Sequence, residues 1–276
     1  MTVTVTPLAA PLGAEIFGLD LKRPLDDATF AAVRRALVDH LVVVVSGLEP
    51  DFQALLRFGR RFGRLVPHVL TQYHHPETSE VSIISTDPAT GAGRTTKAPA
   101  GAFWHSDLSY DANPSDATLL YSVEVPAQGG DTLFCNMVKA YETLPAAMRK
   151  RIEGLTAVHR YGYRGGDAVV DLDKQQHARH PDVVHPVVRV NRDSGRKALF
   201  VNPGFTIRIA GMGADESRSL LDDLFDHCRK PEFHYRHKWR PGQIVACDNR
   251  ATMHSATGGY EGQKRTLWRM IVRGSG

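Results

Sequence analysis

The chain has 276 residues, of which 42% are hydrophobic and 23% are charged, and its formal net charge is +4. This length could hold two domains, but β barrels of this size often form one, so we expect a single domain over residues 1–276. Lysine and arginine are interspersed rather than gathered in a tail. An ordinary solvated surface explains them, small anions are mildly favoured as partners, and nucleic acid is not indicated.

Three cysteines, Cys135, Cys228 and Cys247, are odd in number and show no C-x-x-C spacing. This argues against a disulfide framework and a zinc knuckle, and it fits the reducing cytoplasm. The N-terminus has no basic segment followed by an apolar one, and the longest apolar stretch, residues 41–45, is far shorter than a membrane span. We therefore expect a soluble cytoplasmic protein without membrane contact.

Four segments have the apolar spacing of amphipathic helices. Asp26 or Asp27 can cap the first helix, Gly63 follows the second, and Pro145 starts or breaks the third. We expect these helices from Asp26 or Asp27 through Leu37, and over about residues 51–62, 139–152 and 214–228.

Most of the remaining pattern is typical of strands. We expect strands at residues 41–45, 81–84, 118–125, 185–190, 198–201 and 243–246. Residues 233–240 alternate between an aromatic-rich and a charged face, which predicts that His234 lies on the solvent side. With helices mostly near the ends, the pattern predicts an α+β fold around an antiparallel barrel.

Two segments, residues 85–101 and 162–182, are too rich in turn-forming and polar residues to belong to the core. One interpretation is a pair of mobile surface loops. The other is a pair of active-site lids that keep water from a reactive centre, and the first segment leads directly into His105.

The motif Trp104-His105-Ser106-Asp107 carries the most chemical information. A histidine and a carboxylate two residues apart can point the same way from an extended segment and hold one metal ion. His254, far downstream, is the expected third ligand. Two histidines and one carboxylate cover one face of a metal and leave the other open to reactants, which is the geometry of a non-haem iron oxygenase.

The H-x-D spacing alone is weak evidence, because His180-Pro181-Asp182 repeats it and His75-Pro76-Glu77 matches its glutamate variant. Both of these have a central proline and polar surroundings. His105, by contrast, lies in a partly apolar stretch that could exclude bulk water. A hydrogen-bonded structural pair is the alternative interpretation of His105 and Asp107.

Six motifs support the metal-site interpretation, and they occur in a fixed order along the chain. They are Leu12-Gly13-Ala14-Glu15-Ile16 with Gly18-Leu19-Asp20-Leu21, Arg61-Phe62-Gly63-Arg64-Leu65, the W-H-S-D motif, Gly129-Gly130-Asp131-Thr132-Leu133, Ala198-Leu199-Phe200-Val201-Asn202, and the block from Asp248-Asn249-Arg250 to Arg269. Together they resemble the taurine/2,4-dichlorophenoxyacetate dioxygenase family of Fe(II)- and 2-oxoglutarate-dependent oxygenases.

The resemblance implies a double-stranded β-helix (jelly-roll) barrel with flanking helices, and it implies Fe(II), 2-oxoglutarate and O2 as cofactor and cosubstrates. The implied reaction hydroxylates or oxidatively cleaves a small anionic organic substrate and releases succinate and CO2. Sulfonates, sulfate esters, aryloxyalkanoates and other carboxylates are the expected substrate classes. A homo-oligomer, either a dimer or a tetramer, is also expected.

The resemblance assigns roles to single residues. His105, Asp107 and His254 match the iron ligands of the family. Arg265 matches the arginine that pairs with the distal carboxylate of 2-oxoglutarate, and Thr132 matches a hydroxyl that helps to hold the same carboxylate. A guanidinium group suits a carboxylate because its forked donors match the two oxygens.

Three further residues are expected at the primary substrate. Arg269 lies an even number of residues after Arg265, so on a strand it shares the same face and can meet the acidic group of the substrate. A permanent ion pair with a protein carboxylate is the alternative for Arg269. His68 and Phe205 match family positions near the substrate.

The chain departs from the family pattern at two positions. Gly101 replaces an asparagine that some sulfonate-using members have, and Cys247 stands where an aromatic residue is common. These departures put taurine in doubt as the substrate.

Two other classes of protein fit part of the pattern. A zinc hydrolase can use two histidines and an aspartate, but it would leave Arg265 and Thr132 without a role, and no general base is marked. A non-catalytic small-molecule-binding jelly roll would tolerate loss of the metal ligands, yet all three are present.

Overall fold

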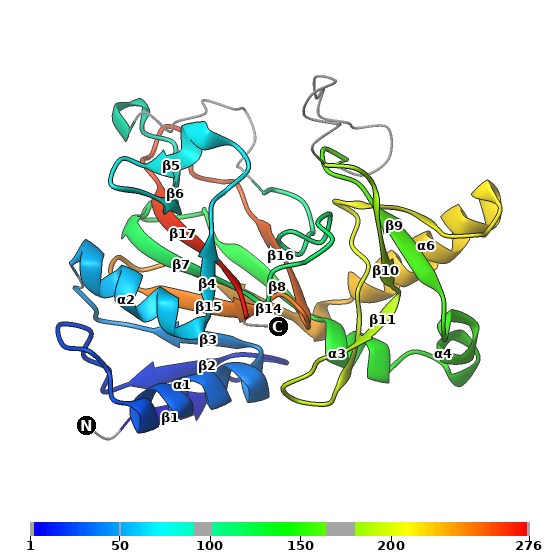
Figure 1. Cartoon of the computed structure of the whole chain (residues 1–276), viewed down its shortest axis with the longest axis horizontal. Coiled ribbons are helices and arrows are strands. Elements are labelled where there is room, and N and C mark those ends of the chain that lie inside the picture. The colour runs from blue at the N-terminus through cyan, green and yellow to red at the C-terminus, as the bar shows by residue number, and fades with distance from the viewer. Residues whose placement is uncertain (1–2, 50, 91–100, 164–179, 275–276) are drawn as a thin grey trace.

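The computed structural model describes residues 3–49, 51–90, 101–163 and 180–274. It contains four sheets and several helices (Figure 1), so the expected α+β class is confirmed. Within those residues no helix combines the length and the apolar character that crossing a bilayer requires.

The largest sheet has nine strands. Its strands are β1 (Thr4–Pro7), β2 (Ala14–Phe17), β3 (Val42–Val45), β4 (Arg64–Val66), β5 (His74–His75), β6 (Thr78–Ser85), β7 (Ala117–Glu124), β15 (Ile244–Asp248) and β17 (Thr266–Arg273). They run in the order β1-β2-β3-β15-β7-β17-β6-β5, and β4 also pairs with β17.

Strand β3 consists of four consecutive valines, all buried. Val43 and Val45 belong to one core cluster, whereas Val42 and Val44 belong to another. Because successive strand residues point to opposite faces, both faces of the sheet must be covered here. This double burial explains why the segment is apolar throughout instead of alternating.

Helices α1 (Asp27–His40) and α2 (Phe52–Phe62) cover one face of this sheet (Figure 1). Asp26 caps α1 by accepting the N–H of Thr29 at 2.7 Å, and Asp51 caps α2 by accepting the N–H of Ala54 at 2.6 Å. Both helix starts and the end of α2 before Gly63 are confirmed.

The third expected helix is divided as predicted, into α3 (Met137–Glu142) and α4 (Ala146–Ile152), with Pro145 at the start of α4. Helix α6 (Ala214–Cys228) matches the fourth expectation. Short 3-10 turns lie at Thr71–Tyr73, Pro88–Thr90 and Pro231–Phe233.

Three smaller sheets complete the fold. The first contains β8 (Thr132–Asn136), β14 (His234–His237) and β16 (Thr252–Ala256), with β8 in the middle. The second contains β9 (Thr156–His159), β10 (Val183–Pro186) and β13 (Thr206–Ile209), with β9 in the middle, and the third pairs β11 (Val188–Val190) with β12 (Lys197–Leu199). In Figure 1 the β9–β11 region and α6 stand beside the large sheet.

Two expectations are wrong in detail. The single strand expected at residues 185–190 is two strands in different sheets, because the N–H of Val187 bonds Leu155 and its carbonyl bonds Phe200. His234 is half-buried rather than on the solvent side. Its Nε2 lies 2.8 Å from the carbonyl of Cys228, and its ring lies 4.7 Å from that of Trp104 between centroids.

The two expected lid segments fall largely on residues 91–100 and 164–179, which lie outside the described residues. Their described ends include Thr86, whose main chain bonds Arg265 and whose hydroxyl accepts the Arg265 N–H at 3.0 Å. A lid function stays a prediction.

Gly129 lies in the turn before β8, where a side chain has no room. Its φ is +76°, and a Cβ added there would clash with the carbonyl oxygen of Gly259. Gly154 has nearly the same φ, +74°, with nothing within 4 Å of an added Cβ. Left-handed backbone costs a non-glycine residue roughly 1–2 kcal/mol, and Gly129→Ala adds a backbone clash to that cost.

We therefore expect Gly129→Ala to lower the free energy of unfolding by clearly more than Gly154→Ala, which should lose roughly 1–2 kcal/mol. Urea unfolding of both variants measures this difference. Equal losses would show that the close approach of Gly129 to Gly259 does not constrain the fold.

Candidate active site

His105 and His254 face each other across an isolated antiparallel bridge. The N–H of His105 donates to the His254 carbonyl at 3.0 Å, and the N–H of His254 donates to the His105 carbonyl at 2.7 Å. Residues directly opposite in such a pair carry their side chains on the same face, only about 4.5–5.5 Å apart at Cβ. The backbone thus joins the first and last elements of the expected site.

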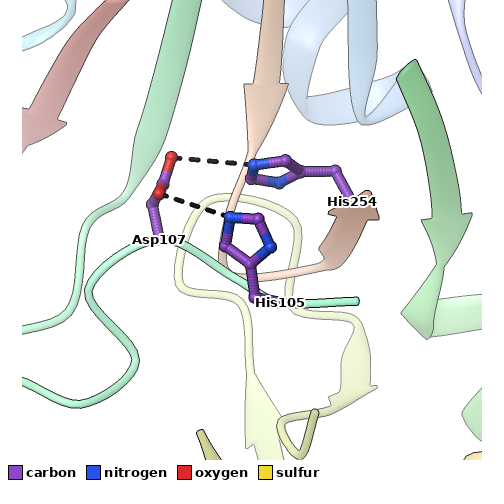
Figure 2. Close-up of side chains that lie close together, drawn as sticks. All are labelled: His105, Asp107 and His254. Atoms are coloured by element: carbon purple, nitrogen blue, oxygen red, sulfur yellow. Dashed lines mark ion pairs between the residues drawn. The ribbon is translucent and has the colours of Figure 1, made fainter. Parts of the chain in front are cut away.

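Asp107 completes the group, as Figure 2 shows. One carboxylate oxygen, Oδ1, lies 3.8 Å from Nε2 of His105, and Oδ2 lies 3.8 Å from Nε2 of His254. All three side chains are buried, and their candidate ligand atoms lie within 4.8 Å of one another. Among the described residues, no other group of three or more His, Cys, Asp or Glu side chains meets this geometry.

The protonation states fit a divalent transition metal. Nδ1 of His105 lies 2.8 Å from the Phe103 carbonyl and donates to it, so Nε2 keeps its lone pair toward Asp107. Burial, with His254 close by, lowers the pKa of His105 to about 3, and burial also lowers the pKa of His254. Neutral imidazoles and an ionised carboxylate are the forms that ligate iron.

The carboxylate of Asp107 stays ionised although it is buried. Burial alone would raise its pKa, but Arg269, the two histidines and the Thr118 hydroxyl outweigh that effect and hold the pKa below its ordinary value. The site therefore presents a fixed negative charge at neutral pH.

The two other H-x-D/E matches do not form metal sites among the described residues. The ring of His180 lies 4.9 Å from that of Tyr161, and Asp182 pairs with Arg160 at 2.7 Å. His75 stacks on Phe52 at 4.1 Å. These contacts show structural roles.

A cavity of about 860 Å³ opens from the three candidate ligands. It lies between the large sheet, which contributes Leu120 and Arg269, and the β14-β8-β16 sheet, which contributes Thr132 and His254. Arg265 and Arg269 both line it, as their even spacing predicts.

Arg265 and Thr132 both line the cavity. Arg265 is 4% exposed, its Nε donates to the Gly130 carbonyl at 3.0 Å, and its guanidinium lies 5.8 Å from the Tyr260 ring. The hydroxyl of Thr132 accepts the indole N–H of Trp239 at 3.0 Å. Because an indole nitrogen only donates, the hydroxyl proton of Thr132 is left for another acceptor.

The remaining predicted residues lie around the ligands on the same cavity. Nδ1 of His68 lies 3.1 Å from the N–H of Leu70 and 3.4 Å from the Leu70 carbonyl, and the shorter contact favours Nδ1 as an acceptor with the ring proton on Nε2. Burial first and Arg269 second lower the pKa of His68 to about 3, so the ring is neutral. Phe205 is buried, and its ring lies 5.9 Å from that of His105.

Arg269 is close to Asp107, with Nη1 3.4 Å from Oδ1. Among the described residues, its buried Nε has no hydrogen-bond partner. The protein carboxylate that the alternative interpretation required is therefore present, but it is the carboxylate of the metal motif, and it does not accept the Nε–H.

Sequence reasoning missed two sets of residues at this site. The first is an aromatic wall, in which Tyr110 lies 4.7 Å from Phe205 and 4.6 Å from Tyr161 between ring centroids. The second is a polar network behind Asp107 that includes Thr118 and Asn249. Their nearness to the W-H-S-D and D-N-R motifs was the only available signal, because the contacts join distant segments.

Comparison with known proteins agrees with this geometry. A family model described as "Taurine catabolism dioxygenase TauD, TfdA family" matches residues 4–271. The chain is 33% identical to pentalenolactone F synthase of Streptomyces arenae, over 97% of this chain and 94% of that protein. It is 33% identical to an alpha-ketoglutarate-dependent sulfate ester dioxygenase of Pseudomonas putida, over 99% of this chain and 90% of that protein.

It is also 32% identical to the alpha-ketoglutarate-dependent 2,4-dichlorophenoxyacetate dioxygenase of Cupriavidus pinatubonensis, over 92% of each chain. Among solved structures, AAD-2 in complex with Mn(II) and N-oxalylglycine matches with a TM-score of 0.83 and 27% identity, over 100% of this chain and 98% of that one. The chain belongs to the TauD/TfdA family of dioxygenases.

Proposed function

We propose that this protein is an Fe(II)- and 2-oxoglutarate-dependent dioxygenase that hydroxylates or oxidatively cleaves a small organic acid. The observation that carries the proposal is the buried His105–Asp107–His254 group at a cavity that Arg265, just before β17, and Arg269, on β17, also line. Relatives named for sulfate ester and 2,4-dichlorophenoxyacetate oxidation support the substrate class.

The three ligands would hold Fe(II), which when bound supplies the activation of O2 that is coupled to conversion of 2-oxoglutarate into succinate and CO2. The chain's own residues bind and orient the two organic substrates and exclude water. A zinc hydrolase or a non-catalytic binding module is not favoured, because the family match names dioxygenases.

Arg265 and Thr132 are proposed to hold the distal carboxylate of 2-oxoglutarate. A guanidinium group this buried needs an anionic partner. Among the described residues, its hydrogen bond to the Gly130 carbonyl uses the Nε–H alone, and the terminal NH2 groups remain for an anion. Trp239 fixes the Thr132 oxygen as an acceptor, so the hydroxyl proton can be donated to the same carboxylate.

Arg269 and His68 are proposed to meet the acidic group of the primary substrate. The unpartnered Nε of Arg269 supports this, because a buried guanidinium donor without an acceptor is costly. His68 can add a neutral Nε2–H donor. A permanent ion pair between Arg269 and Asp107 is the competing proposal.

The body of the substrate is proposed to be apolar. Phe103, Tyr110, Tyr161 and Phe205 line the cavity together with Ile271, and most of them form one buried cluster. Such a wall suits an alkyl or aromatic group better than the ammonium group of taurine. Gly101 at the asparagine position is consistent with this preference.

Arg269→Ala is expected to raise the Michaelis constant for the acid by about tenfold to more than a hundredfold, because hydrogen bonds to charged groups contribute roughly 1.5–3 kcal/mol. Slow succinate formation without the acid should persist. Steady-state kinetics with and without the acid separate these parameters, and exposed Arg208→Ala serves as the matched control. An unchanged Michaelis constant would favour the permanent ion pair.

The general test of the function is anaerobic loading with Fe(II) and 2-oxoglutarate, followed by a screen of sulfonates, sulfate esters, aryloxyalkanoates and other carboxylates for succinate release after O2 is admitted. Efficient turnover of neutral or cationic compounds, with no response to anionic analogues, would contradict the acid-substrate proposal.

The proposal includes a jelly-roll barrel in a single domain over residues 1–276. Two sheets that contribute side chains to one cavity, and two core clusters that share one sheet, support it. A cytoplasmic location is supported by three free, buried cysteines. The expected dimer or tetramer is tested by light scattering on the purified chain.

A further inference from the structure

Behind Asp107 lies a buried polar network that the proposed chemistry does not use. The hydroxyl of Thr118, on β7, lies 2.6 Å from Oδ2 of Asp107, and the hydroxyl of Ser115 lies 2.6 Å from the Asp107 carbonyl oxygen. The side-chain nitrogen of Asn249 lies 2.8 Å from the Thr118 oxygen and 2.9 Å from the Ser115 oxygen. None of these three side chains is more than 1% exposed.

The direction of every hydrogen bond in this network is fixed by the acceptors. A carboxylate oxygen and a carbonyl oxygen can only accept, so Thr118 and Ser115 must both give their single hydroxyl protons to Asp107. Each hydroxyl oxygen then has to accept from its other neighbour. The Asn249 atom that faces them must therefore be the NH2 group, whose two protons match the two hydroxyl oxygens.

This arrangement leaves one buried polar atom of Asn249 without a partner among the described residues. With its NH2 group turned to the hydroxyls, Asn249 leaves its Oδ1 buried and without a hydrogen-bond partner in the part of the chain that the structure describes. A buried unpaired acceptor costs free energy, and the opposite amide orientation would leave two hydroxyl oxygens facing an acceptor. The network therefore keeps both hydrogen bonds to Asp107 and leaves the Oδ1 acceptor of Asn249 unused.

We propose that Asn249, Thr118 and Ser115 act as positioning residues that hold the Asp107 carboxylate and its backbone in the ligating orientation before the metal binds. The proposal rests on the metal-binding function proposed above. Thr118 bonds one lone pair of Oδ2, while Ser115 holds the main chain of the same residue. The two carboxylate oxygens are thereby kept facing His105 and His254.

The polar network links segments that carry different candidate metal ligands. Asn249 lies in the turn between β15 and β16, and β16 carries His254, whereas Ser115 and Thr118 follow the segment that carries His105 and Asp107. The N–H of Asn249 also donates to the Asp116 carbonyl at 2.9 Å. The D-N-R motif thus gains a specific role at its central residue, which is to connect the two halves of the site.

The experiment measures metal affinity of the metal-free full-length protein by calorimetric titration with Co(II), and with Fe(II) under anaerobic conditions. Thr118→Val keeps the shape of the side chain but removes the hydroxyl. Loss of such an outer hydrogen bond typically weakens metal binding about 10- to 100-fold, which is the expected result. Thr118→Ser restores the hydroxyl and should bind metal within about threefold of the wild type.

Thr206→Val is the matched control. Thr206 is 1% exposed, and its hydroxyl accepts the N–H of Asn202 at 2.9 Å. This hydrogen bond does not involve Asp107. It should lose thermal stability as Thr118→Val does, yet keep wild-type metal affinity. If Thr118→Val binds metal as tightly as Thr206→Val, the positioning role is overturned. If the wild type itself binds no metal, the proposed function fails instead.

Asn249→Leu tests the polar network separately and carries the test should Thr118→Val not fold. It removes the donor that orients both hydroxyls, and we expect a smaller loss of metal affinity, about three- to tenfold. The double variant should bind little more weakly than Thr118→Val alone, because residues in one network are not additive. Wild-type affinity in Asn249→Leu, or fully additive losses, would show that Asn249 does not act through Thr118.

Discussion

Replacing His105, Asp107 or His254 by alanine is expected to abolish turnover and tight binding of Fe(II). Each residue is proposed to supply one of three protein ligands, and the remaining two could not enclose one face of the metal. In Asp107→Ala the site also loses its negative charge beside Arg269. Succinate release measures turnover, and calorimetric titration of the metal-free variants with Fe(II) measures binding.

His180→Ala is the matched control, because His180-Pro181-Asp182 has the same spacing as the metal motif. Its ring lies against Tyr161 rather than in a metal-binding group, so this variant should bind Fe(II) like the wild type. Full activity in His105→Ala together with loss of activity in His180→Ala would mean that the wrong pair has been assigned.

Arg265→Ala is expected to weaken 2-oxoglutarate binding by about tenfold to more than a hundredfold, because it removes charged hydrogen bonds worth roughly 1.5–3 kcal/mol. The effect should be large because the guanidinium is almost fully buried and its charge is therefore little screened. The apparent affinity is read from the dependence of succinate formation on 2-oxoglutarate concentration.

Arg229→Ala provides the comparison, since its guanidinium is exposed and pairs with Asp226 at 2.6 Å on the surface. Exposed pairs of this kind contribute little, so 2-oxoglutarate affinity should not change. Unchanged affinity in Arg265→Ala would remove Arg265 from the cosubstrate site and leave Thr132 without its proposed charged partner.

The helix boundaries could be predicted from the sequence because the interactions that set them are local. Asp26 and Asp51 bond N–H groups three residues away, and Pro145 separates α3 from α4 through its own ring. The strand pattern was less informative. Val187 separates β10 from β11 through bonds to Leu155 and Phe200, and neither partner could be identified from alternation.

The candidate metal site and its surroundings were also predictable only where they depend on local sequence. The spacing of His105 and Asp107 and the order of the motifs pointed to the ligands. The even spacing of Arg265 and Arg269 predicted their shared face, because strand geometry is periodic. The polarity of the His234 face, by contrast, was misjudged, since the Trp104 ring that covers it comes from a distant segment.

The sequence by itself therefore determined the family, the helices, the three metal ligands as a hypothesis and the two arginines that line one cavity. Each of these depends on local chemistry or on motifs that are contiguous in the chain. Only the tertiary structure decided that Asn249 orients the Thr118 hydroxyl toward Asp107 and that Trp239 orients Thr132. Asn249 and Thr118 are 131 residues apart, and Trp239 and Thr132 are 107 apart. Contacts at such separations follow from how the sheets pair and pack, which no periodicity in one segment records.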